Sequence, residues 1–166
     1  MPIVDLSGAK ILLVDDNPTN LKVLWQALEE EAYEIMAATS GEQAIQLAHD
    51  GRPDLILLDV MMPYMDGFET CRRLKADSQT AEIPVLFITA RDETEALVEG
   101  FSAGGFDYIV KPFRSAEVLA RTRTHLERTW LAKMLAAKNG ELQDKNAQLQ
   151  EEIDRRRRLS AWHRPP

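Results

Sequence analysis

Acidic, hydroxyl and cationic residues stand at the ends of strongly apolar runs in the first 113 residues of this chain. Asp15 and Asp16 stand at the end of the first run, Asp59 ends the third, Thr89 ends the fourth and Lys111 follows the fifth. Three carboxylates brought together would repel one another unless a cation lies among them. Oxygen ligands suit Mg²⁺, which keeps several waters and usually shares its coordination with a phosphate. This set of residues therefore predicts a site for Mg²⁺ and a phosphoryl group.

Lys111 and Thr89 have the chemistry to complete that site. The lysine supplies a positive charge for phosphoryl oxygens, and the threonine hydroxyl supplies a hydrogen-bond donor. Each residue also has an ordinary structural explanation. Asp16 and Asn17 can cap a helix, Thr89 is a common strand residue, and Lys111 can lie in a solvated turn. Their joint occurrence at the ends of the runs favours the functional interpretation.

Five short apolar runs must position these residues. Most are continuous rather than alternating, as expected of parallel strands that are covered on both faces. The segments between them have helical periodicity, with helix start signals at Asn17, Ser40 and Asp66. This alternation predicts an α/β domain with a parallel sheet and right-handed crossovers, whose functional residues lie at the carboxyl ends of the strands. The expected strands are 10–15, 33–38, 54–59, 84–89 and 106–110.

Composition places the chain among globular proteins with one domain and a short appendage. Of 166 residues, 45% are hydrophobic and 28% are charged, which is too apolar for a disordered chain. The single cysteine, Cys71, excludes an internal disulfide or a cysteine-cluster metal site, and three scattered histidines argue against a zinc site. No apolar run approaches the roughly 18 residues of a membrane span, and the N-terminus has no signal-peptide core. We therefore expect a cytoplasmic protein without membrane contact.

The net charge of −7 is unevenly distributed along the chain. Residues 1–125 hold 21 acidic and 11 basic residues, a balance of −10, whereas residues 126–166 hold 6 and 9, a balance of +3. An acidic body argues against nucleic acid as a partner of the globular part. The basic excess lies mostly in Arg155–Arg158, and such a run more often forms a solvated face than a site for nucleic acid or lipid.

The segment from Ser115 to about Arg158 is predicted to form one helix, because it is helical in pattern and contains no proline. Its second half has leucine every seven residues, with asparagine or isoleucine four residues after each leucine. This is the heptad pattern of a coiled coil with leucine at d, and asparagines at a favour a parallel pair in fixed register. A solvated single helix is the alternative. The residues of the predicted dimer helix are Leu135, Asn139, Leu142, Asn146, Leu149 and Ile153.

Four segments of the first 126 residues resemble the receiver domain of two-component response regulators. They are LLVDDNPTN, LILLDVMMPYMDGFE, PVLFITA and FDYIVKPF, and the resemblance extends over about residues 8–126. It implies a flavodoxin-like (βα)5 fold of three layers, with a five-stranded parallel sheet of order 2-1-3-4-5. We therefore expect a receiver domain at 1–126, a coiled-coil helix continuing the fifth helix at 127–158, and a disordered tail at 159–166.

The resemblance also implies a role for each residue of the site. Asp59 would be the phosphoacceptor, receiving its phosphoryl group from a sensor histidine kinase or a phosphotransfer protein. Mg²⁺ would be held by Asp15, Asp16, Asp59 and the backbone carbonyl of Met61. Lys111 would pair with the phosphoryl group.

A conformational switch is expected from Thr89 and Tyr108. Thr89 would move toward the phosphoryl group and Tyr108 would follow it inward, which would alter the surface of the fourth helix, fifth strand and fifth helix. The peptide bond between Lys111 and Pro112 would be cis, an isomer that suits a tight turn.

The implied function is signalling rather than enzyme catalysis. The receiver would pass its change through a homodimeric helix to an output module that this chain lacks. A stand-alone scaffold, whose coiled coil binds partners and for which phosphorylation is secondary, is the alternative. A phosphatase of the haloacid dehalogenase type would need a second acid where this chain has Met61. A flavodoxin would need a Ser/Thr/Gly-rich phosphate loop after the first strand.

Overall fold

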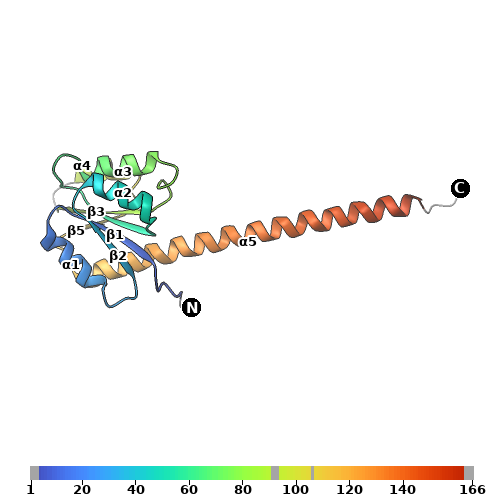
Figure 1. The fold of residues 1–166 in the computed structure, drawn as a ribbon, viewed down its shortest axis with the longest axis horizontal. Helices are drawn as coiled ribbons and strands as arrows, with labels where there is room; N and C mark the ends of the chain where they lie inside the picture. The colour runs from blue at the N-terminus through green and yellow to red at the C-terminus, as the bar shows by residue number, and fades with distance from the viewer. Residues whose placement is uncertain (1–3, 91–93, 106, 163–166) are drawn as a thin grey trace. The chain divides into compact units, whose positions relative to one another are not determined.

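The computed structural model describes residues 4–90, 94–105 and 107–162. The chain forms two compact units, residues 1–129 and 130–166. The first unit contains a five-stranded parallel sheet in the order β2-β1-β3-β4-β5, which confirms the predicted fold class (Figure 1). The strands are β1 (Lys10–Val14), β2 (Glu34–Ala38), β3 (Leu55–Asp59), β4 (Val85–Ala90) and β5 (Asp107–Lys111).

Helices alternate with the strands, and three of them begin where the sequence predicts. Asn17, Ser40 and Asp66 each accept a hydrogen bond at the side chain from a backbone N–H of the following turn, which satisfies a donor that the helix itself cannot pair. Pro18 is the first residue of α1, a position where no N–H is needed. The helices are α1 (Pro18–Leu28), α2 (Gly41–Gly51), α3 (Gly67–Ala76), α4 (Thr94–Ser102) and α5 (Ser115–Trp162).

The sheet is covered on both faces, as its continuous apolar strands require. Successive side chains of β1 enter different cores because they point to opposite faces. Leu12 and Val14 pack in the core on the side of α2 and α3, whereas Ile11 and Leu13 pack with α1 and the first part of α5. All four side chains are fully buried. The sheet is thus a firmly held platform for the residues at its carboxyl edge.

Thr122 in α5 is buried, and its hydroxyl oxygen has no hydrogen-bond partner among the described residues. Replacing such a hydroxyl by a methyl group of similar size removes a desolvation cost. We expect Thr122→Val to raise the free energy of unfolding by about 1 kcal/mol, measured by urea denaturation. Thr124→Val is the control and should gain nothing, since Thr124 is exposed and its hydroxyl donates to Ala120 O at 2.9 Å. A Thr122→Val chain no more stable than wild type would contradict this expectation.

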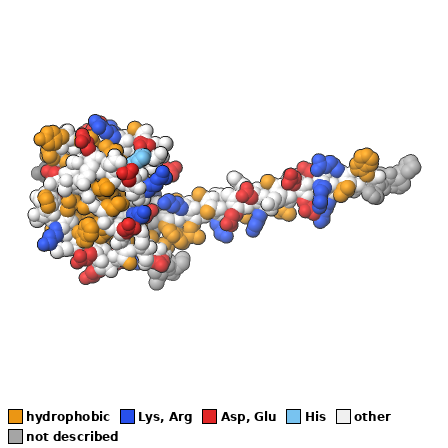
Figure 2. All heavy atoms as spheres, in the orientation of Figure 1, with side chains coloured by type: hydrophobic (Ala, Val, Ile, Leu, Met, Phe, Trp, Pro, Cys, Tyr) orange, Lys and Arg blue, Asp and Glu red, His pale blue; other side chains and the backbone are white. Residues whose placement is uncertain are grey.

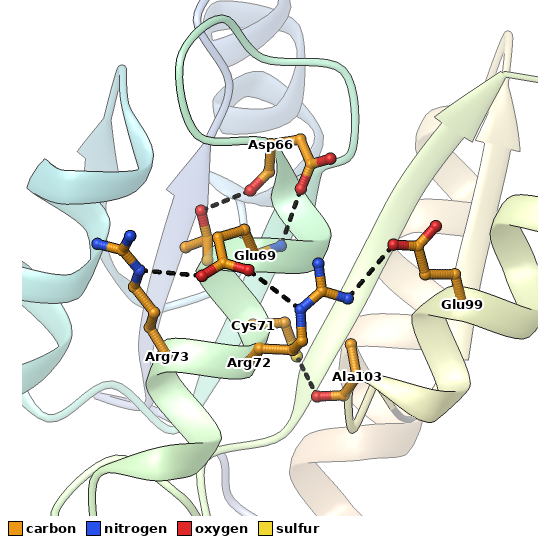
Figure 3. Close-up of polar contacts among 8 residues, drawn as sticks. Asp66, Glu69, Cys71, Arg72, Arg73, Glu99 and Ala103 are labelled. Atoms are coloured by element: carbon orange, nitrogen blue, oxygen red, sulfur yellow. Dashed lines mark hydrogen bonds and ion pairs between the residues drawn. The ribbon is translucent and has the colours of Figure 1, made fainter.

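Polar contacts join α3 to α4 and to the residue after it (Figure 3). Arg72 of α3 donates from Nε to Glu69 at 3.1 Å and from Nη1 to Glu99 of α4 at 3.3 Å. The Cys71 thiol donates to Ala103 O at 3.4 Å, and burial raises the pKa of this thiol to about 11. Cys71 is therefore a core residue rather than a reactive thiol.

The second unit is the part of α5 from Trp130 onward, and its residues 130–162 are all exposed. Figure 2 shows acidic and basic side chains interspersed along it, with hydrophobic side chains between them. The expectation of a disordered tail from residue 159 is wrong for residues 159–162, which are helical. The helix can continue because the sequence contains no proline between Pro112 and Pro165. Residues 163–166 lie outside the described residues.

No helix in the described residues combines the length and the apolar character needed to cross a membrane.

Candidate functional site

Asp15 and Asp59 lie next to each other at the carboxyl ends of β1 and β3. Val14 pairs with Leu58 across these parallel strands, so the following residues, the two aspartates, fall in the same row. Both side chains are buried, with exposures of 1% and 3%. The register of the sheet thus brings together two acids that are 44 positions apart in the chain.

Asp16, which is exposed, completes a cluster of three acids. One carboxylate oxygen from each of Asp15, Asp16 and Asp59 lies within 4.8 Å of the other two. Oδ1 of Asp15 accepts a hydrogen bond from Asn17 N at 2.9 Å, whereas its buried Oδ2 has no hydrogen-bond partner among the described residues. An oxygen-only cluster with an unsatisfied carboxylate oxygen is compatible with Mg²⁺ binding.

Lys111 reaches this cluster from the end of β5. Its Nζ donates a hydrogen bond to Asp59 Oδ1 at 3.0 Å and lies 3.9 Å from Asp15 Oδ2. The peptide bond from Lys111 to Pro112 is cis, the isomer that the resemblance implies. The structure therefore brings one ammonium group together with the three carboxylates that the sequence singled out.

Burial dominates the electrostatics of the two central carboxylates. It raises the pKa of Asp15, against the opposing effects of the Asn17 N–H and of Lys111. Burial also raises the pKa of Asp59; the hydrogen bond from Lys111 opposes this, and the charge of Asp15 reinforces it. Without a cation, both groups therefore bear their negative charge at a cost in free energy.

A short loop after β3 holds the backbone beside Asp59. The loop closes where Gly67 N donates to Val60 O at 2.9 Å. A Cβ atom on Gly67 would collide with the backbone oxygen of Asp59 and lie 2.9 Å from Val60 Cα, so only glycine fits. Met61, whose carbonyl is a predicted metal ligand, lies in this loop with its side chain 64% exposed. In the sequence, Gly67 is marked only by its place after the helix-start residue Asp66, and its contact with the site was not predicted.

Tyr64, in the same loop, has a backbone φ of 68°, and its side chain is fully exposed. An aromatic residue is strained in this left-handed region, whereas asparagine tolerates it. We expect Tyr64→Asn to raise the free energy of unfolding by about 1 kcal/mol, since the exposed ring contributes no packing. Tyr64→Val should lower it, because a β-branched side chain fits this region worst. Urea denaturation of both variants checks the prediction, and the reverse order of stability would refute it.

Thr89 and Tyr108, the predicted switch residues, lie on the neighbouring strands β4 and β5. Thr89 is buried, pairs with Val110, and donates from Oγ1 to Ala90 O at 3.4 Å. Tyr108 is half-buried, and its ring meets that of Phe101 edge-on, with 6.2 Å between the ring centres. Their coupled movement stays a prediction.

Asp107 forms a polar cluster that the sequence did not lead us to predict. Its Oδ2 accepts from Arg121 Nη1 at 2.7 Å and lies 3.0 Å from His125 Nε2. Burial alone would raise the pKa of Asp107, but hydrogen bonds, led by the one from His125, hold it below its ordinary value. The cluster ties the start of β5 to α5. The spacing of four residues between Arg121 and His125 on one helix is the signal that could have found it.

Comparison with known proteins identifies the first unit. Residues 11–123 match the model of the response regulator receiver domain. The chain is 42% identical over 120 residues to the DNA-binding dual master transcriptional regulator RpaA of Synechocystis sp., covering 72% of this chain and 50% of that protein. It is 44% identical over 117 residues to the response regulator PleD of Caulobacter vibrioides, covering 70% of this chain and 26% of PleD. The chain thus spans half or less of the length of these relatives.

Solved structures agree with this result. The fold resembles that of the chemotaxis protein CheY4 of Vibrio cholerae, with a TM-score of 0.66 and 33% identity over 72% of this chain and 99% of that chain. It also resembles the receiver domain of the Francisella response regulator 1452, with a TM-score of 0.67 and 32% identity over 74% of this chain and 99% of that chain. The range matched by the family model, residues 11–123, contains the three acids and the lysine of the site. The chain therefore belongs to the family of response regulator receiver domains.

Proposed function

We propose that this chain accepts a phosphoryl group on Asp59 from a phosphohistidine of a sensor histidine kinase or phosphotransfer protein. The observation that carries the proposal is the buried Asp59 carboxylate, with Lys111 Nζ 3.0 Å from Oδ1 and two further carboxylates beside it. Membership of the receiver family supports the same role. In this proposal the chain is a signalling domain that assists only its own phosphorylation and dephosphorylation.

The transfer exchanges one bond to phosphorus for another. A carboxylate oxygen of Asp59 attacks the phosphorus atom, the P–N bond of the phosphohistidine breaks as the P–O bond forms, and the imidazole leaves as the neutral base after taking up a proton. Lys111 already lies beside Asp59, so its ammonium group can hold the incoming phosphoryl oxygens by charge-assisted hydrogen bonds. Thr89 would then donate from its hydroxyl to a phosphoryl oxygen, and Tyr108 would follow it inward.

Asp15, Asp16 and Asp59 would hold Mg²⁺, with the backbone carbonyl of Met61 as a further ligand. The residues present fit the ion, because the cluster offers only oxygen ligands and the buried Oδ2 of Asp15 lacks a hydrogen bond within the described residues. When bound, Mg²⁺ supplies positive charge that offsets the carboxylates and the phosphoryl group. Lys111 carries one positive charge and cannot by itself balance three carboxylates.

Phosphorylation by acetyl phosphate tests the proposal without a kinase. We expect acetyl phosphate and Mg²⁺ to add one phosphoryl group to the full chain, seen by intact-mass spectrometry. EDTA should prevent the reaction, and hydroxylamine should remove the group, as it does for an acyl phosphate. A chain that stays unmodified would overturn the proposal, and so would one that releases phosphate over many turnovers as a phosphatase does.

The raised pKa values of Asp15 and Asp59 predict how stability depends on pH without the ion. Each carboxyl binds its proton more tightly in the folded state, so it favours folding below its unfolded pKa of about 3.9. This contribution is lost as the pH rises through the higher folded pKa. In EDTA, we therefore expect wild type to gain stability relative to Asp15→Asn/Asp59→Asn as the pH falls from 7. Urea denaturation at several pH values measures this difference. A difference that does not change with pH would contradict the prediction.

We propose further that the C-terminal helix passes the change to an output module as one half of a homodimer. The exposed leucines Leu135, Leu142 and Leu149 support this pairing. Light scattering with Mg²⁺, with and without beryllofluoride as a mimic of the phosphoryl group, tests it. A dimer in either state would support the proposal, and a monomer in both states at about 100 µM would overturn it.

A scaffold whose partners do not depend on phosphorylation is the second candidate, because the same exposed leucines could bind other helices. Comparing the proteins that bind to the immobilised wild-type chain with those that bind to immobilised Asp59→Asn distinguishes the signalling domain from the scaffold. An unchanged set would favour the scaffold.

A further inference from the structure

The second unit leaves a regular stripe of side chains exposed along one face of its helix. With Ala132 numbered as a, the stripe consists of the a and d positions, and we call these residues the seam. Leu135, Leu142, Leu149 and Ile153 are 63%, 55%, 62% and 43% exposed. The seam extends over about 32 Å at 1.5 Å per residue. Its members are Ala132, Leu135, Asn139, Leu142, Asn146, Leu149 and Ile153.

We propose that the seam binds the seam of a second copy of this chain in parallel orientation and without offset, and that Asn139, Asn146 and Arg157 select this arrangement. The inference deepens the dimer part of the proposed function. It does not depend on phosphorylation of Asp59, so a chain that cannot be phosphorylated leaves it intact.

The two asparagines distinguish the possible parallel registers. Without offset, Asn139 faces Asn139 of the second copy and Asn146 faces Asn146. Each amide both donates and accepts, so each pair can satisfy itself within the seam. An offset of one heptad leaves a single Asn–Asn pair and places the remaining asparagines against Ala132 and Ile153. The buried amides would then lack partners, at a cost in free energy.

The asparagines also disfavour an antiparallel pair. The antiparallel alignment that overlaps the seam from Leu135 to Ile153 places Leu135 opposite Ile153 of the second copy. In that alignment, Asn139 faces Leu149 and Asn146 faces Leu142, because a positions then face d positions. Each of the four asparagines would bury an amide against a leucine, so the arrangement loses every Asn–Asn hydrogen bond.

Charges beside the seam favour the same parallel arrangement. Arg157 stands at an e position and Glu152 at a g position, and a g residue meets the e residue five positions further along the partner helix. Glu152 Oε1 already lies 3.6 Å from Arg155 Nη2 and 3.0 Å from Arg156 Nη2 of its own helix. In the described residues, Arg157 has no such acidic neighbour. In the parallel pair, Glu152 of the second copy would be the acidic neighbour of Arg157. Arg157 would then have a specific role within the run Arg155–Arg158.

The flanking lysines are neutral in the parallel arrangement and have opposing effects in the antiparallel one. In the parallel pair, Lys138 faces Gln143 and Lys145 faces Gln150, with no repulsion. In the antiparallel alignment, Lys145 faces Lys145 of the second copy across the symmetry axis. That alignment does bring Lys138 near Glu152, so the charges alone would not decide the orientation. The asparagines decide it.

Disulfide cross-linking of single-cysteine variants tests the orientation. The native Cys71 is fully buried, so the wild-type chain is the blank. Parallel pairing without offset predicts that Leu135→Cys and Leu149→Cys each cross-link with themselves under mild oxidation. In an antiparallel pair, the two copies of residue 149 would be about 15 Å apart along the axis and would not react. Ala137→Cys, at an f position on the outer face, is the control and should form no cross-link.

Mixed samples identify the competing arrangements. A cross-link between Leu135→Cys and Ile153→Cys that exceeds the self-cross-links would establish an antiparallel pair and overturn the proposal. A dominant link between Leu135→Cys and Leu142→Cys would establish the offset parallel pair and also overturn it. No link in any variant, together with a monomer mass at about 100 µM, would overturn the pairing itself.

Two sets of variants test the residues that select the arrangement. Arg157→Glu should weaken the dimer about fivefold, as expected when two partly exposed attractive pairs become repulsive. Arg158→Glu changes the charge equally at an f position and should leave the dissociation constant unchanged. Asn139→Leu/Asn146→Leu should tighten the dimer and raise the antiparallel Leu135→Cys/Ile153→Cys link from background to a level comparable with the parallel one. If this double variant stays wholly parallel, the asparagines do not set the orientation.

Discussion

Replacing Asp59 by asparagine is expected to abolish phosphorylation by acetyl phosphate while making the ion-free protein more stable. The reaction is lost because an amide oxygen is not a nucleophile of carboxylate strength, so we expect a decrease of at least about 100-fold. The free energy of unfolding rises because the variant removes a buried negative charge that the carboxylates of Asp15 and Asp16 repel. The gain should be about 1 kcal/mol in the free energy of unfolding at pH 7 in EDTA.

The opposite signs of the two effects make this result diagnostic. A variant that had simply misfolded would lose phosphorylation and stability together. Intact-mass spectrometry measures the first effect and urea denaturation the second. Asp50→Asn, an exposed position on α2, is the control and should keep the wild-type rate. Phosphorylation of Asp59→Asn at the wild-type rate would place the phosphoacceptor elsewhere.

Gly67→Ala is expected to destabilise the fold strongly, although the first residue of a helix is a position where alanine is normally well tolerated. Here the added Cβ meets the backbone of Asp59 and Val60 rather than a flexible side chain. Backbone cannot yield without moving the end of β3, so we expect a loss of about 3 kcal/mol in the free energy of unfolding. Since the displaced segment carries Asp59, phosphorylation by acetyl phosphate should slow as well.

Gly140→Ala is the matched control for this prediction. The chemical change is the same, but a Cβ at Gly140 meets nothing within 4 Å. Gly140 lies inside the exposed part of α5, so alanine should stabilise the helix by about 1 kcal/mol. Thermal and urea denaturation followed by circular dichroism measure both variants. If Gly67→Ala retained wild-type stability and activity, the close approach of the loop to Asp59 would have no energetic importance.

Much of the fold could be predicted because the relevant signals are local. Each of the five strands begins and ends within one residue of a predicted apolar run. A strand buried on both faces needs an unbroken run of apolar residues, and this leaves a clear mark in the sequence. The helix starts at Asn17, Ser40 and Asp66 were predictable for the same reason, since a cap pairs with backbone only two or three residues away.

The composition of the site was also determined by the sequence. Once a parallel sheet is expected, the carboxyl ends of its strands must share one edge, so Asp15, Asp59 and Lys111 had to lie near one another. The sequence also determined the seam of the second unit, because a heptad repeat depends only on spacing along one helix.

Only the tertiary structure decided how those residues meet. In the structure, Lys111 Nζ donates a hydrogen bond to Asp59 but lies only within ion-pair distance of Asp15. One buried oxygen of Asp15 has no hydrogen bond in the described residues. Gly67 packs against the end of β3. The structure also joins Asp107 to α5. These contacts link elements that are far apart in the chain, and their geometry depends on strand register, twist and the packing of helices on the sheet. Such long-range geometry leaves no periodic trace in the sequence, whereas strands, caps and heptads do.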